Sequence, residues 1–406
     1  MTDLFAPEFL TSLESSVVPT ASAESLPPAC YADPDWFAFE KSTIFESEWL
    51  CAGRVDRIPN PGDYFTVTLL DEPLIVVRSK DGNVRVLSAV CQHRAMTVAE
   101  GEGNCSTFTC PYHHWVYGND GRLLGAPAMH LTDDFDKAGF GLPSLPVEVW
   151  QGFVFTTFAD PANLPASPNE RFAKAEPYMR NFNLDKAVTP TVQAFPGMPW
   201  NWKVMFENFN DGYHANKLHA GIHDFCPSEN AEFTDWDDAD GTIVRTNRFV
   251  HIDGGFNPMQ KALLPIFPDI SEDERWRVTF ALLPPNLMIG MAPDQVFYFR
   301  LNPTSVSTID LEVGYVLDPK ALEHPLFELL FAQSEMGVRV IVEQDIDATT
   351  RVQKGLTSRF APRGRYSWQE EAQRQMNRWL VSRYRTHWTS RPQVPSTAVG
   401  DPTRRR

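Results

Sequence analysis

The sequence is poor in positive charge. Its 36 Lys and Arg residues stand against 52 Asp and Glu residues, so the formal charge is 36 − 52 = −16. A chain of this charge repels phosphate, which makes nucleic acid and an anionic membrane surface poor partners. The apolar fraction of 43% and the charged fraction of 22% are those of an ordinary globular protein. A length of 406 residues suffices for roughly two to three domains.

Cysteines and long apolar runs are also scarce. Six cysteines are too few for a scaffold built on disulfide bonds. The first residues, Met-Thr-Asp-Leu-Phe, lack the basic and apolar segments of a signal peptide. No stretch reaches the ~18 apolar residues of a membrane span. We therefore expect a cytoplasmic protein with reduced thiols and no membrane partner, a setting in which cysteines near histidines favour metal binding.

The residue pattern changes near position 160. We expect an N-terminal arm and helix over 1–45, a β-rich domain over 46–160, a mixed domain over 161–390 and a disordered tail over 391–406. Lys80-Asp81-Gly82-Asn83, between two apolar runs, indicates a β-hairpin. Helices are predicted over 36–50, 203–217, 325–354 and 368–384, and strands over 64–69, 74–78, 84–90, 241–252, 276–283, 286–291, 295–301 and 308–317.

Two Cys/His pairs lie in the β-rich region. Cys91 and His93 are followed, after sixteen residues, by Cys110 and His113. Two thiolates and two imidazoles bind either zinc or an iron–sulfur cluster. Each loop offers one Cys and one His, which suits a [2Fe-2S] cluster in which one iron takes both thiolates and the other both imidazoles, as in Rieske centres. A zinc site and a chance set of buried residues are the alternatives.

A second constellation, Asp211-x2-His214-x4-His219, lies in the mixed domain. Two histidines and one carboxylate on one face of an octahedron hold a non-haem Fe(II) and leave positions open. Asp211 and His214, three residues apart, share a helix face. His219 does not fit that face, so the helix must end or distort between His214 and His219 if both are to reach one metal.

The third ligand must come from elsewhere, and the C-terminal helix offers three acidic residues. Glu343 and Asp347 point away from the apolar stripe of this helix, whereas Asp345 lies on it. A carboxylate on an apolar face is costly to bury unless it is paired or bound to a metal, so Asp345 is the candidate. The alternative is a buried Asp that bonds a neighbouring segment. The stripe consists of Val338, Ile341, Val342, Asp345, Thr349 and Val352.

The whole arrangement resembles the catalytic alpha subunit of the Rieske non-haem iron oxygenases, the aromatic ring-hydroxylating family. The resemblance runs from about Trp36 to Tyr384. It rests on Cys110-Pro111-Tyr112-His113-x-Trp115, on Asn208-x2-Asp211-x2-His214-x4-His219 and on Gln344-Asp345 with the segment behind it. Family members often have Gly where this chain has His114, so His114 is not taken as a ligand.

The resemblance implies an α+β fold, with an N-terminal Rieske [2Fe-2S] β-domain followed by a START-like helix-grip catalytic domain. That second domain would be an antiparallel sheet with a long C-terminal helix. The mononuclear Fe(II) would be held by His214, His219 and Asp345. Asp211 and Asn208 belong to the implied catalytic set. Asp211 would link His214 to His113 of a neighbouring subunit, which implies a ring, commonly a homotrimer, with or without a beta subunit.

The implied reaction uses O2 and a small organic substrate, aromatic by default. NAD(P)H would act only through a separate flavin reductase, a ferredoxin or both. The alternative reaction is N- or O-demethylation of a methylated amine, betaine or aryl ether. Two other classes of protein are also considered: a Rieske electron-transfer protein without oxygenase activity and a zinc-stabilised binding protein. Phe206, Phe209 and Phe297 are the predicted substrate contacts. Further candidate walls are Trp200, Trp202, Phe280, Tyr298 and Phe299, and the arginines on predicted strands are Arg245, Arg248, Arg277 and Arg300.

Overall fold

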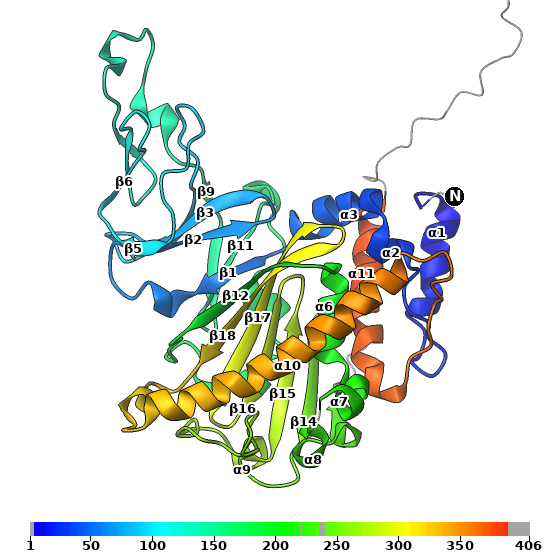
Figure 1. Ribbon diagram of the computed structural model, residues 1–406. Coiled ribbons are helices and arrows are strands. Elements are labelled where there is room, and N and C mark those ends of the chain that lie inside the picture. Colours follow the sequence, from blue (N-terminus) through cyan, green and yellow to red (C-terminus); the bar gives the residue numbers. More distant parts are fainter. Residues whose placement is uncertain (1–3, 220, 235–239, 389–406) are drawn as a thin grey trace, which may run out of the picture.

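The computed structural model describes residues 4–219, 221–234 and 240–388 (Figure 1). Within these residues the strands form four antiparallel sheets. The predicted disordered tail over 391–406 lies outside them. No helix in the described ranges is long and apolar enough to cross a membrane.

The β-rich region contains the hairpin that the sequence predicts. The central strands of its five-stranded sheet match the predicted runs, and Gly82 in the turn has a φ of +86°, a conformation that favours glycine. The sheet has the order β5 (Glu102–Asn104), β2 (Asp63–Leu69), β3 (Glu72–Arg78), β4 (Val84–Ser88) and β9 (Ser144–Leu145). Two three-stranded sheets flank it: β6 (Thr107–Thr109), β7 (Val116–Gly118) and β8 (Leu123–Gly125); and β1 (Leu50–Arg54), β11 (Phe153–Thr156) and β10 (Val147–Trp150).

A seven-stranded sheet forms the centre of the second region. Its order is β12 (Val192–Met198), β18 (Thr308–Val316), β17 (Gln295–Ser305), β16 (Leu287–Ala292), β15 (Arg277–Leu283), β14 (Ile243–Arg248) and β13 (Ala231–Phe233). The five inner strands match predicted runs, the last of which are dense in apolar residues. The edge strands β12 and β13 were not, because neither has a buried side and β12 contains Pro196 and Gly197.

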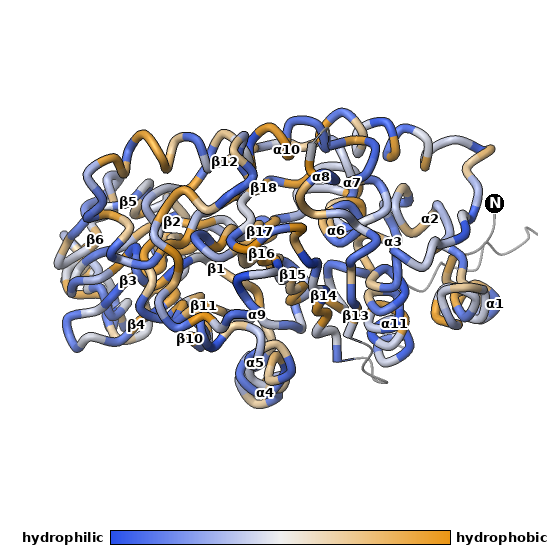
Figure 2. Tube along the Cα trace, turned by 90° about the horizontal axis from the view of Figure 1, so that it is seen from below, coloured by the Kyte–Doolittle hydropathy of each residue, from blue (hydrophilic) through white to orange (hydrophobic). Residues whose placement is uncertain are grey.

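The long helix α10 (Phe327–Leu356) crosses one face of this sheet (Figure 1). In Figure 2 it lies on the opposite side of the molecule from α4 (Pro168–Arg171) and α5 (Glu176–Met179). Because side chains alternate along a strand, Phe297 and Phe299 of β17 pack in the core on the α10 side. Tyr298 faces the other way, where its ring meets Phe153 edge-on at 5.3 Å.

The helix predictions over 36–50 and 325–354 need correction. The helix predicted over 36–50 consists of α3 (Pro34–Glu40) and a π-helical turn (Lys41–Phe45), and Leu50 already begins β1. Within α10, the apolar stripe was predicted to include Val352. Val352 is exposed, and Gln353 is the buried residue at that position instead. The spacing 345, 349, 353 keeps to one face of the helix.

The N-terminal helices are tied to the rest of the fold by a buried ion pair. Lys203, on α6 (Trp202–Asn210), donates from Nζ to both carboxylate oxygens of Glu40 at 2.7 Å. Trp202 Nε1 also donates to Glu40, at 2.9 Å, and so does the hydroxyl of Tyr384 on α11 (Glu371–Thr386). Glu40 and Lys203 are both fully buried. This network fixes the start of α6, the helix that ends at the candidate site described below.

Lys203→Met is expected to lower the free energy of unfolding by about 3–5 kcal/mol, because it leaves the Glu40 carboxylate buried without its counter-charge. The double substitution Glu40→Gln/Lys203→Met removes both charges and should recover part of that loss. Urea-induced unfolding, followed by circular dichroism, measures both variants. A double variant no more stable than the single one would contradict this account of the network.

Candidate metal centres and substrate pocket

The two histidines of the second motif lie on either side of a helix end. His214 is on α7 (Gly212–Leu218), and His219 is the first residue after it, with extended dihedral angles (φ −100°, ψ 93°). Because the chain leaves the helix there, the two Nε2 atoms approach to 3.1 Å. This confirms the expectation that the helix ends between His214 and His219. A second break, at Asp211, separates α6 from α7, so the prediction of a single helix over 203–217 was wrong: the segment forms two helices.

Asp345 reaches the same point from α10. Its Oδ1 lies 3.2 Å from Nε2 of His219 and 3.5 Å from Nε2 of His214. Asp345 is only 9% exposed. The other two acids of this helix, Glu343 and Asp347, are exposed and pair with arginines on the helix surface. Two imidazoles and one carboxylate therefore converge, with all three ligand atoms within 4.8 Å of one another.

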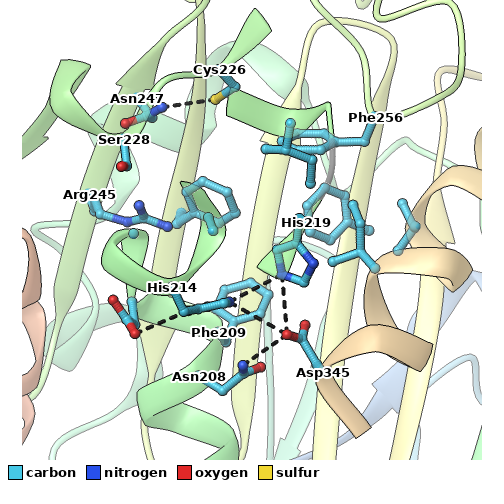
Figure 3. A pocket seen from close by; sticks show the side chains of 18 of the residues that line it. Asn208, Phe209, His214, His219, Cys226, Ser228, Arg245, Asn247, Phe256 and Asp345 are labelled. Carbon is cyan, nitrogen blue, oxygen red and sulfur yellow. Dashed lines mark hydrogen bonds and ion pairs between the residues drawn. The ribbon is translucent and has the colours of Figure 1, made fainter. Parts of the chain in front are cut away.

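Each of these three side chains is oriented by a neighbour, as Figure 3 shows for Asp345 and Asn208. Nδ1 of His214 lies 3.1 Å from Oδ2 of Asp211, and Nδ1 of His219 lies 2.9 Å from Oε1 of Gln344. An acceptor at Nδ1 holds the proton on that nitrogen and leaves the Nε2 lone pair free. Asn208 donates from Nδ2 to Oδ1 of Asp345 at 3.0 Å. The role of Gln344 as a partner of His219 was not predicted, because no periodic pattern points to it.

The electrostatics of this site favour a positive charge between the three side chains. Burial disfavours the imidazolium, yet hydrogen bonds to Asp211 and Asp345 raise the pKa of His214 to about 9. Burial also opposes ionisation of Asp345, but both imidazoles hold the pKa of its carboxyl below the ordinary value. A donor set of two Nε2 atoms and one carboxylate in such a field fits a divalent metal such as Fe(II).

The two Cys/His loops of the β-rich region have matching turns. Ala95 N donates to the carbonyl of Cys91, and His114 N donates to the carbonyl of Cys110, both at 3.0 Å. Ala95 and His114 have φ angles of 60° and 55°. His114 is thus an exposed turn residue in the left-handed region, which gives a physical reason for glycine at this position in family members.

These turns bring the two predicted histidine ligands close to each other, and the two predicted cysteine ligands close to each other. The rings of His93 and His113 lie 4.6 Å apart, and Nδ1 of His113 is buried with no hydrogen-bond partner among the described residues. The Cys91 thiol is 3.2 Å from the hydroxyl of Tyr117. Burial raises the pKa of Cys91, but hydrogen bonds from Tyr117, from backbone amides and from Cys110 bring it below its ordinary value. A pair of neighbouring cysteines, one with a lowered thiol pKa, and a free imidazole nitrogen fit a [2Fe-2S] cluster.

The other four cysteines lack such surroundings. Cys30, Cys51 and Cys226 are buried and Cys105 is partly buried. Burial raises the pKa of Cys51 to about 12 and that of Cys226 to about 11, so these thiols stay protonated.

The two constellations lie far apart in the molecule. Cys110 directly follows β6, whereas His214 lies on α7. In both Figure 1 and Figure 2, β6 and α7 lie well apart, with strands of the seven-stranded sheet between them.

A pocket with largely apolar walls opens beside His214, His219 and Asp345. Phenylalanine side chains dominate its walls, with Ile222, Val338 and Ile341 between them. Phe206 does not belong to this wall, because it is turned into the core and packs edge-on against Trp202 at 5.8 Å. Trp200, Trp202 and Tyr298 likewise lie outside the pocket wall. The phenylalanines are Phe209, Phe256, Phe280, Phe297 and Phe299.

Several pocket residues escaped the sequence analysis. Phe256 lies in the irregular stretch between β14 and α9 (Glu272–Arg275), where no period identifies a buried face. Ser228 lies in a short 3-10 turn, and Asn247 on β14 reads as an ordinary strand residue. Arg245, also on β14, was one of four arginines that the sequence left undistinguished. The alternation of β14 places Arg245 and Asn247 on the pocket side.

Comparison with known proteins agrees with this geometry. Residues 175–386 match the family described as "Ring hydroxylating alpha subunit (catalytic domain)", and residues 48–144 match "Rieske [2Fe-2S] domain". The glycine betaine monooxygenase oxygenase subunit of Chromohalobacter salexigens is 35% identical over 219 residues, which are 54% of this chain and 47% of that protein. The match thus spans about half the length of this curated relative.

Solved structures share the fold. A quaternary ammonium Rieske monooxygenase in complex with L-carnitine superposes with a TM-score of 0.76 and 21% identity, over 91% of this chain and 98% of that one. Naphthalene 1,2-dioxygenase from Rhodococcus sp. superposes with a TM-score of 0.78 and 18% identity, over 96% and 100%. The chain therefore belongs to the ring-hydroxylating alpha-subunit family, with a Rieske [2Fe-2S] domain preceding the catalytic domain.

Proposed function

We propose that this chain is the terminal oxygenase component of a Rieske system that hydroxylates a small organic substrate. The observation that carries the proposal is the convergence of His214, His219 and Asp345 at the wall of an apolar pocket. These three side chains would hold the mononuclear iron, and Cys91, His93, Cys110 and His113 would hold the cluster. When bound, the cluster supplies electrons one at a time and the mononuclear iron supplies the chemistry that activates O2.

The chain itself would orient the reactants and exclude water. The phenylalanine side chains give the substrate an apolar enclosure, which protects a reactive oxidant from side reactions. Asn208 would keep Oδ1 of Asp345 turned toward the histidines, and Asp211 would keep a proton on Nδ1 of His214. Both contacts act on the ligands, so Asn208 and Asp211 are positioning residues in this proposal.

Electrons would come from NAD(P)H through a separate flavin reductase, a ferredoxin or both. Because the two sets of predicted ligands lie well apart within one subunit, we infer that the cluster of one subunit serves the iron of its neighbour. Asp211, whose side chain is 17% exposed, could then accept a hydrogen bond from His113 of that neighbour. This arrangement requires a ring, and we propose a homotrimer, with or without a beta subunit, in the cytoplasm.

Oxidation of a methyl group on nitrogen is the second candidate reaction. Two similar proteins are named for glycine betaine and for quaternary ammonium substrates. Aromatic rings around a pocket can hold a cationic ammonium group through their π faces. Five phenylalanines line the pocket of this protein. The ligand set is the same for hydroxylation and demethylation, so the pocket and not the metal decides between them.

Product analysis distinguishes the two reactions. The purified protein, with a surrogate reductase, NADH and O2, is expected to convert either an aromatic compound into a hydroxylated ring product or an N-methyl compound into formaldehyde and the demethylated amine. Oxygen-18 from labelled O2 should enter the hydroxyl group of a ring product, whereas the oxygen of formaldehyde exchanges with water. If neither class of substrate is oxidised although the cluster is reduced, the electron-carrier alternative gains over the oxygenase.

Asp345→Ala is expected to keep the visible absorption of the cluster and to lower the iron content from about three to about two atoms per chain, because one mononuclear ligand is lost. Turnover should fall to background. Asp347→Ala, which removes an exposed carboxylate two residues away, is the matched control and should change neither value. Full iron content in the Asp345→Ala protein would remove this residue from the metal site.

Tyr117→Phe is expected to lower the reduction potential of the cluster, because it removes a hydrogen bond to the Cys91 sulfur that stabilises the more negative, reduced state. A differential stabilisation of about 1 kcal/mol corresponds to roughly 40 mV for one electron. Spectroelectrochemical titration measures the shift. Tyr64→Phe, at a tyrosine that packs on Phe108 in the same domain, is the control, and equal potentials in all three proteins would contradict the assignment.

A further inference from the structure

A buried arginine at the pocket wall has no ion-pair partner among the residues that the structure describes. Arg245 is only 5% exposed, and within the described part of the chain it makes no ion pair and Nε has no hydrogen-bond partner. Figure 3 shows its guanidinium pointing from β14 into the pocket. A buried charge without a partner is costly. We therefore expect an anionic group of a bound molecule to pair with the Arg245 guanidinium.

The surroundings hold the Arg245 side chain in this position. Its guanidinium lies over the Phe280 ring, with Cζ 4.3 Å from the ring centroid. On another side it lies against Gly212, where a Cβ atom would be 2.9 Å from Nη1. Gly212 thus leaves the space that the guanidinium occupies. A planar fork fixed in this way is pre-organised for two parallel hydrogen bonds to a carboxylate.

Two further polar side chains with free atoms lie at the same end of the pocket. The Ser228 hydroxyl and Oδ1 of Asn247 are buried without hydrogen-bond partners among the described residues. Ser228 is 2% exposed and Asn247 is 3% exposed. Nδ2 of Asn247 donates to Cys226 Sγ at 2.9 Å and to the Pro227 carbonyl at 3.1 Å. The Ser228 hydroxyl is therefore a free donor beside Arg245.

The acidic residues at the pocket are already engaged. Asp345 contacts both histidines, and Asp211 accepts from Tyr213 N and from Nδ1 of His214. Asp211 is near enough to stabilise the charge of Arg245, yet no direct contact joins them. A purely structural role, in which Arg245 only balances Asp211, is the competing explanation. This structural explanation differs from a binding role in one prediction: the pocket would show no preference for acidic over neutral substrates.

We propose that Arg245, assisted by Ser228, binds the carboxylate of an acidic substrate, whose body lies between the phenylalanine rings and extends toward His214, His219 and Asp345. This inference rests on the proposed function and adds the substrate class. Figure 3 shows Arg245 and Ser228 at one end of the pocket and Asp345 at the other, so the atom to be oxidised lies at the end of the substrate remote from its carboxylate. The body can be aromatic, or it can be a quaternary ammonium group as in a betaine.

Calorimetric titration of the holoenzyme in the absence of reductant tests the proposal without turnover. The ligands are two matched pairs, benzoate with benzamide and glycine betaine with its amide, which differ only in the carboxylate. One acid is expected to bind at least about tenfold more tightly than its amide, since charge-assisted bidentate pairing is strong. A preference within the benzoate pair identifies the body of the substrate as aromatic, and a preference within the glycine betaine pair identifies it as a quaternary ammonium group.

Arg245→Gln should bring the ratio of acid to amide affinity close to one. Arg245→Lys, which keeps a positive charge, should retain part of the preference for the acid. The Lys variant keeps the test decisive if the Gln variant does not fold. Arg248→Gln, at the exposed end of the same strand and paired with Asp273, is the control and should keep the wild-type ratio. Neither acid binding more tightly than its amide, or an unchanged ratio in Arg245→Gln, would overturn the carboxylate site. Oxidation of a neutral substrate alongside either result would leave the oxygenase proposal standing.

Discussion

A carboxylate on the buried face of a long helix needs positive charge or a metal beside it, and the catalytic half of this molecule is arranged around that need. Asp345 faces the histidines from α10, with contacts of 3.2 and 3.5 Å to their Nε2 atoms. Removing the partners would leave the charge in an apolar core, where it is unfavourable by several kcal/mol. The break of α6 at Asp211 and the end of α7 at His219 both serve this contact, since a continuous helix could not bring His214 and His219 to one point.

The rest of the fold keeps these elements in register. The seven-stranded sheet supports α10 on one face, and alternate residues of β17 and β14 point into the pocket. The fully buried Glu40–Lys203 pair ties the N-terminal helices to the beginning of α6, whose far end carries Asn208. The site is therefore held by packing from three directions. The walls of the pocket between the sheet and α10 are largely apolar, apart from the metal-site side chains at one end and Arg245, Ser228 and Asn247 at the other. That asymmetry gives the pocket an acid-binding end and an oxidising end.

Much of this could be predicted from the sequence, for identifiable reasons. The ligand sets have demanding spacing, and the apolar stripe on the helix singled out Asp345 from two neighbouring acids. The inner strands were predictable because they are dense in apolar residues, whereas β12 and β13 were not, since they lie at the edges. The lining of the pocket was only partly predictable: Phe206 is in the core, and Phe256 comes from an irregular segment. Among four arginines on strands, only the three-dimensional position of Arg245, buried and without a carboxylate partner, distinguishes it.

The central claim, that three side chains from α7, its C-terminal end and α10 hold a single iron apart from the cluster, is tested most directly by anomalous X-ray scattering. Crystals of the purified protein would be measured on both sides of the iron absorption edge and of the zinc absorption edge. The account predicts one iron peak bounded by His214, His219 and Asp345, and a separate peak from two irons between the loops of Cys91 and Cys110. A map with iron only at the cluster loops, or with a zinc signal in place of the mononuclear iron, would contradict it.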